Sequence, residues 1–173
     1  QVSLARCLDQ RLVLRARRLV DLTVCGEGQP AEIDVGTVVQ RLRWIAPGRF
    51  WMGSPETEVD HQGNEGPQHE VTLTAGFWLA DSACTQALWT AVMGHNPSRF
   101  QGQPGDEHCP VEQVSWDDVQ MFLVNLTERL PGCEPTLPTE AQWEYACRAG
   151  PPTRETTPFS FGDQITPEQV NYD

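Results

Sequence analysis

The sequence has 173 residues and a formal net charge of −12, with 24 acidic residues against 12 arginines and no lysine. A chain of this length can form one domain with a hydrophobic core, and its acidic balance disfavours binding to the phosphates of nucleic acids. No apolar run is long enough to cross a membrane, and nothing near Gln1 resembles a signal peptide.

The charge is unevenly distributed along the chain. Residues 1–50 contain eight Arg and five acidic residues, whereas residues 51–173 contain four Arg and nineteen acidic residues. The acidic part suits a cation or a basic partner, but an ordinary soluble acidic surface is the favoured interpretation.

The first twenty residues place leucines and arginines at spacings compatible with a helix. We interpret residues 1–37 as the tail of an upstream region or a linker helix that packs on a neighbour. A basic amphipathic helix can also lie on a membrane surface, but no aromatic anchor accompanies the arginines here. The expected partner of this segment is therefore an upstream domain or another protein, rather than a lipid bilayer.

The next part of the chain favours strands and turns. We predict an extended segment at residues 38–45 and a second strand at residues 50–52, which ends at Gly53. Residues 71–73 and 77–79 flank Ala75 and Gly76 in the manner of a hairpin. Between these strands, residues 55–69 are predicted to form a long polar loop.

Three helices are predicted from capping signals and apolar spacing. The first covers residues 85–94, with a Thr cap and a Gly stop, and the second covers residues 115–130, with an acidic first turn. The third covers residues 139–150, where Thr139 and Gln142 form a capping box and Gly150 can end the helix. Short strands, helices and long loops together predict an α+β, loop-rich fold.

Apolar spacing on the second and third helices predicts the core. Five residues are expected to be buried: Phe122, Leu123, Leu126, Trp143 and Cys147. Trp143 and Cys147 are four residues apart and therefore share one face of their helix.

Six cysteines are spread through the chain without a C-x-x-C pair or the spacing of zinc ligands. Disulfides are conceivable for an even number, but without evidence of secretion we expect reduced thiols. Cys84 and Cys147 are interpreted as small buried apolar residues.

A metal site is conceivable in the polar loop, which contains His61, Glu65 and His69. Two histidines and a carboxylate can bind iron or zinc. However, Gly66 and Pro67 bend the chain between Glu65 and His69 and prevent helical alignment. We therefore favour a solvated loop over a metal site.

Five sequence blocks in order closely resemble the formylglycine-generating-enzyme (FGE)-sulfatase, or sulfatase-modifying-factor, domain family. They are RFWMGSPETE (49–58), EGPQHEVTL (65–73), NPSRF (96–100), PVEQVSWDDV (110–119) and LPTEAQWEYACRAG (137–150). The resemblance covers residues 38–173 and implies a C-type-lectin-like fold. It ends at Asp173, near the middle of the family's domain, so residues 38–173 are expected to be its N-terminal half. A nick, a truncation or disorder after Asp173 would give the same ending.

The resemblance also implies metal chemistry. The stretch before Asp173 is similar to one that contributes to a structural calcium site, which assigns Asn171 and Tyr172 as two oxygen ligands. The family's copper-binding catalytic cysteine pair would lie beyond this chain, and none of the six cysteines matches it. Related sulfoxide synthases use iron and histidines of an additional domain, and no such histidine motif is present.

Two functions follow from the resemblance. The first is a binding or scaffold module in a larger multidomain bacterial protein, with the other half of its own domain as a partner and no catalysis of its own. The second is an oxidoreductase that converts a protein cysteine to formylglycine with copper and dioxygen. The sequence leaves the choice open. The expected location is the cytoplasm, although a targeting signal upstream of Gln1 would lie outside this chain.

Overall fold

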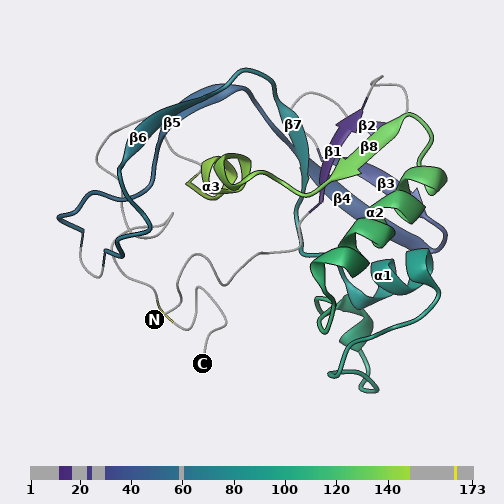
Figure 1. The fold of residues 1–173 in the computed structure, drawn as a ribbon. Helices are drawn as coiled ribbons and strands as arrows, with labels where there is room; N and C mark the ends of the chain where they lie inside the picture. The colour runs from purple at the N-terminus through teal and green to yellow at the C-terminus, as the bar shows by residue number, and fades with distance from the viewer. Residues whose placement is uncertain (1–11, 17–22, 25–29, 59–60, 149–165, 167–173) are drawn as a thin grey trace. The chain divides into compact units, whose positions relative to one another are not determined.

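The computed structural model describes residues 12–16, 23–24, 30–58, 61–148 and 166, and the following account concerns these residues (Figure 1). The chain divides into two compact units. The first contains the described residues up to Ile45 together with residues 77–137, and the second contains residues 46–76 and the described residues from Pro138 onward.

The first unit is built on a six-stranded sheet in which every pair of neighbours is antiparallel. The strand order is β2-β3-β4-β7-β1-β8. The strands are β1 (Val13–Ala16), β2 (Thr23–Val24), β3 (Ala31–Val35), β4 (Val38–Ile45), β7 (Phe77–Ala80) and β8 (Cys133–Thr136). The strand predicted at residues 38–45 is confirmed as β4.

The helix predicted over the first twenty residues is wrong at residues 13–16, which form β1; residues 1–11 and 17–20 lie outside the described residues. β1 lies between β7 and β8, where Val13 and Leu14 are both fully buried. A short continuous apolar run fits a buried strand as well as a helix, and its distant partners decide between them.

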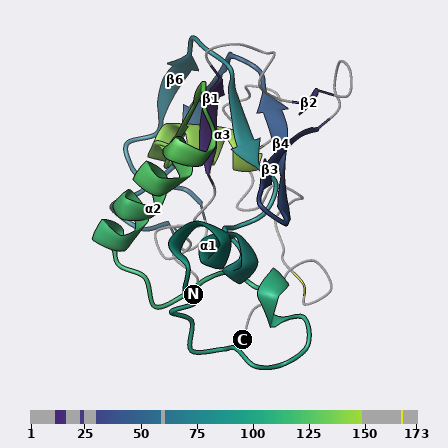
Figure 2. The same ribbon diagram turned by 90° about the vertical axis from the view of Figure 1, so that its right-hand side faces the viewer.

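Two helices lie on one face of this sheet (Figure 2). In α1 (Gln86–Met93), Thr85 Oγ1 accepts the Leu88 N–H and Gly94 ends the helix in a left-handed conformation. α2 (Trp116–Arg129) opens with a capping box between Ser115 and Asp118. A 3-10 helix, η3 (Asp106–His108), lies between them in sequence. Both capped helices agree with the prediction.

The helices and the sheet enclose the core of this unit. Trp89 of α1 stacks on Phe122 of α2 with ring centroids 5.0 Å apart and an interplanar angle of 5°. The predicted burial of Phe122, Leu123 and Leu126 is confirmed, as is that of Cys84. Burial raises the pKa of the Cys84 thiol to about 12, so this cysteine packs as a neutral apolar residue.

The second unit contains a two-stranded sheet of β5 (Gly48–Met52) and β6 (His69–Leu73), with α3 (Glu140–Arg148) packed against β5. The hairpin predicted between residues 71–73 and 77–79 is wrong, because β6 pairs with β5, whereas β7 pairs with β4 and β1. The Ala75–Gly76 segment therefore links two different sheets.

The capping box of the third helix is confirmed: Gln142 N–H donates to Thr139 Oγ1 and Thr139 N–H donates to Gln142 Oε1. Its predicted stop at Gly150 lies outside the described residues. The predicted burial is wrong for Cys147, which is exposed, and Trp143 is only half-buried.

The reason is the orientation of α3. Tyr145 packs on Phe50, and Glu144 and Arg148 bond to the backbone of Gly53. The side of α3 that packs against β5 therefore carries Glu144, Tyr145 and Arg148, and Trp143 and Cys147 lie on a different side of the helix.

Candidate functional site

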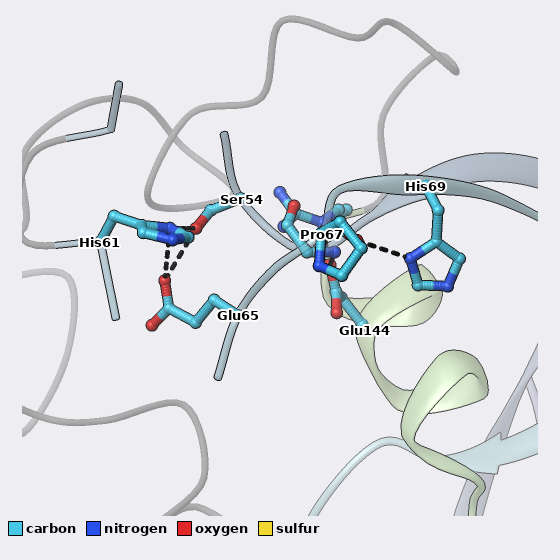
Figure 3. A network of polar contacts seen from close by, with 8 residues as sticks. Ser54, His61, Glu65, Pro67, His69 and Glu144 are labelled. Atoms are coloured by element: carbon cyan, nitrogen blue, oxygen red, sulfur yellow. Dashed lines mark hydrogen bonds and ion pairs between the residues drawn. The ribbon is translucent and has the colours of Figure 1, made fainter. Parts of the chain in front are cut away.

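A cluster of polar side chains gathers where β5 ends and the polar loop begins (Figure 3). Ser54 Oγ lies 2.7 Å from His61 Nδ1 and donates to Glu65 Oε2 at 2.8 Å. The backbone closes the same loop, since Ser54 N–H donates to the Glu65 carbonyl at 3.2 Å. Ser54 is buried, so the cluster anchors the loop from within.

This cluster has a serine, a histidine and a carboxylate, but the order of its bonds differs from that of a nucleophilic triad. The serine hydroxyl has one proton, which it donates to Glu65, so His61 Nδ1 must donate to Ser54 Oγ rather than accept from it. A base that donates to the serine cannot remove its proton. The geometry supports loop anchoring rather than nucleophilic catalysis.

A second group of contacts joins the start of this loop to α3. Gly53 N–H donates to Glu144 Oε1 at 2.9 Å, and Arg148 Nη2 donates to the Gly53 carbonyl at 3.0 Å. Glu144 and Arg148 are themselves paired at 2.7 Å across one helical turn. Charged side chains thus satisfy both backbone groups of Gly53.

Burial raises the pKa of the nearby Glu58 carboxyl, and the positive charge of Arg148 opposes this shift. The neighbouring carboxylates of Glu65 and Glu144 raise the Glu58 pKa further.

The structure brings together only part of the metal site considered for the polar loop. His61 and Glu65 meet, with His61 Nδ1 3.7 Å from Glu65 Oε2, but His69 Nδ1 lies 2.9 Å from the Pro67 carbonyl and away from them (Figure 3). Within the part of the chain that the structure describes, no group of three His, Cys, Asp or Glu side chains is placed to hold a metal ion.

The other assigned ligands, Asn171 and Tyr172, lie outside the described residues. Ser54 lies within the RFWMGSPETE block, but its residue type and spacing did not predict its contacts with His61 and Glu65. Glu112 of the PVEQVSWDDV block was not predicted as a contact residue either; its Oε1 accepts the N–H groups of Arg99 and Phe100 and so joins that block to NPSRF. Within the described residues, no helix has the length and apolar character needed to span a bilayer.

A family model identifies the domain to which this chain belongs. The family model of the sulfatase-modifying factor enzyme 1-like domain, FGE-sulfatase, matches residues 31–173. The chain is 30% identical over 157 residues to a formylglycine-generating enzyme of Streptomyces coelicolor, covering 82% of this chain and 47% of that protein. It is 32% identical over 104 residues to the formylglycine-generating enzyme of Mus musculus, covering 60% of this chain and 23% of that protein.

Among solved structures, PvdO from Pseudomonas aeruginosa has a similar fold, with a TM-score of 0.62 and 22% sequence identity. This similarity covers 83% of the present chain and 59% of the PvdO chain. The chain thus spans about half the length, or less, of the curated relatives that it matches.

Proposed function

The chain belongs to the FGE-sulfatase family, and from that premise we propose that it is a binding or scaffold module of a larger multidomain bacterial protein, without catalysis of its own. Its partners in this proposal are the rest of its own domain and an upstream domain or partner protein.

The outward face of α2 carries this proposal. Trp116, Met121 and Val124 have exposed fractions of 68%, 56% and 61%, although the helix is firmly capped and packed on its other side. Trp and Met are enriched at protein interfaces, and exposed apolar side chains gathered on one rigid element are typical of a contact surface. A face of this kind supports association with another polypeptide surface.

The second candidate function is oxidation of a protein cysteine to formylglycine with copper and dioxygen. Its support is the printed name of the relatives, which are formylglycine-generating enzymes. The family resemblance implies that the cysteine pair for this reaction lies beyond residue 173. Cys84 is a poor substitute, because its raised pKa leaves almost no thiolate at neutral pH.

The two candidates are separated by incubating the intact protein with copper, dioxygen and a peptide that carries the sulfatase cysteine motif. We expect no aldehyde on the peptide, measured with a hydrazide probe and mass spectrometry. An aldehyde that forms with the folded protein, but not with heat-denatured protein, would overturn the non-catalytic proposal and establish the oxidoreductase.

Hydroxyl-radical footprinting of the same intact protein tests directly whether a partner covers the outward face of α2. Met121 should be oxidised far less than its exposure in this chain implies, because the partner covers it. Phe100 is exposed and lies outside the α2 face, so it serves as the internal reference. Strong oxidation of Met121, after correction for intrinsic reactivity, would show that no partner occupies the face.

We also propose that Asn171 and Tyr172 contribute to a structural calcium site, as the resemblance implies. An Asn side-chain oxygen and a main-chain carbonyl suit a hard cation, but they supply only part of the roughly six to eight oxygens that calcium takes. Calcium should therefore raise the unfolding midpoint of the intact protein by mass action, and Asn171→Ala should abolish that increase. Asn125→Ala, which removes an amide from α2 instead, should leave the calcium response intact.

A further inference from the structure

A groove of about 440 Å³ lies in the first unit, beside α1, the turn between β3 and β4, and the loop that leads into η3. Ala87 and Ala91 of α1 and Val38 of β4 contribute small apolar side chains to its lining. Asp106 and Glu107 of η3 contribute two carboxyl groups. The groove therefore combines an apolar surface with negative charge.

Hydrogen bonds to a buried glutamine hold the lining of the groove in place. Gln86 is 2% exposed, and its Nε2 donates to the Phe100 carbonyl at 2.9 Å. Its Oε1 accepts from Asn96 Nδ2 at 2.8 Å. Because both ends of the amide are bonded, the loop after Phe100 is tied to α1, and the groove does not have to be ordered by a ligand.

The two carboxylates are oriented by their own loop. Asp106 Oδ2 accepts the Gln103 N–H at 2.7 Å, and Glu107 Oε2 accepts the Gly105 N–H at 3.1 Å. Each carboxylate has a second oxygen that can accept from a ligand. The exposed His108 lies beside them, with its Nε2 3.7 Å from Glu107 Oε1.

We propose that this groove binds a lysine or arginine side chain presented by a basic peptide segment of a partner protein. The aliphatic stem of such a side chain packs on the alanines and Val38, while its cationic end bonds to Asp106 and Glu107. The excess of acidic residues after residue 50 attracts the same kind of partner at longer range. This inference rests on the proposed binding function and gives its partner a chemistry.

The test measures binding of a fluorescently labelled, end-blocked hexa-arginine peptide to the intact protein by anisotropy, at low and at physiological ionic strength. We expect binding that weakens about tenfold in the double variant Asp106→Asn, Glu107→Gln, since two charge-assisted contacts of modest strength are lost. Each amide keeps an oxygen for the loop N–H, so the loop should stay folded. Ala87→Leu, which fills the groove without changing charge, should also weaken binding.

The matched control is Asp34→Asn, Glu56→Gln, which removes the same charge from two exposed side chains that lie outside both the groove and α2, and it should change the affinity by less than about twofold. Equal weakening in both double variants would show attraction to net charge alone and overturn the groove. Normal binding by the Ala87→Leu variant, or no binding by the unmodified protein, would overturn it as well. Footprinting of Met121 does not depend on this peptide, so failure of the groove and failure of the proposed function are distinguishable.

Discussion

Replacing Phe122 by alanine is expected to reduce the free energy of unfolding of the first unit by roughly 3–5 kcal/mol. Phe122 is 1% exposed and stacks on Trp89, so the change removes buried apolar area, leaves a cavity between α1 and α2 and ends an aromatic contact. Native-state hydrogen exchange with mass spectrometry on the intact protein measures the effect in peptides from α1 and α2.

Two further variants make this prediction specific. Phe122→Leu should cost less than Phe122→Ala, because it leaves a smaller cavity. Glu128→Ala, on the exposed side of α2, should change stability by no more than about 0.5 kcal/mol. If Phe122→Ala had no greater effect than Glu128→Ala, the ring would not be part of the packed core.

Replacing Gly53 by alanine is expected to destabilise the second unit by roughly 2–3 kcal/mol. Gly53 has a φ of 85°, in the left-handed region, and an added Cβ would overlap the carbonyl oxygen of Glu65. That carbonyl accepts the Ser54 N–H, so it cannot move away without breaking the closure of the loop. Faster hydrogen exchange in residues 53–58 and 61–69 and in α3 is the expected observation.

Gly63 provides the matched control in the same loop. An alanine there meets no described atom within 4 Å, and its backbone does not require glycine. Gly63→Ala should change stability by less than about 1 kcal/mol in either direction, since its main effect is on the unfolded chain. Equal effects at Gly53 and Gly63 would show that the contact with Glu65 does not constrain the loop.

Helices α1 and α2 could be predicted from sequence because their end signals are local. Thr85 and Gly94 bound α1, and Ser115 with Asp118 opens α2, through bonds between residues three or four positions apart. The apolar residues of α2 at helical spacing also identified its buried face correctly. The five sequence blocks that resemble the FGE-sulfatase family added the prediction of the overall fold.

The predictions that the structure contradicts concern contacts between segments that are distant in sequence. β1 contains an apolar run that fits either a helix or a strand, and its pairing with β7 and β8 decided the matter. The segments now called β6 and β7 looked like a hairpin because they are neighbours in sequence, yet each pairs with a different strand. Their spacing alone contains no information about those partners.

In the candidate site, too, residue types were predictable from the sequence, whereas their contacts were not. His61 and Glu65 were singled out by residue type, whereas Ser54 was not, and their meeting depends on how the loop closes over the end of β5. His69 belonged to the same sequence cluster but turns to the Pro67 carbonyl. Residue types limited the possible chemistry, and the three-dimensional arrangement selected loop anchoring over metal binding.

The sequence by itself determined the α+β class, the boundaries of α1 and α2, the core face of α2 and the family, because capping, periodicity and ordered motifs are encoded in short segments. Tertiary structure decided which strands pair, which side of α3 is buried and how the polar loop is anchored. Exposure of Cys147 illustrates the reason: a helical stripe is fixed by spacing, but its burial depends on which stripe a distant strand happens to meet. Such contacts are set by the packing of the whole unit, and no local pattern contains them.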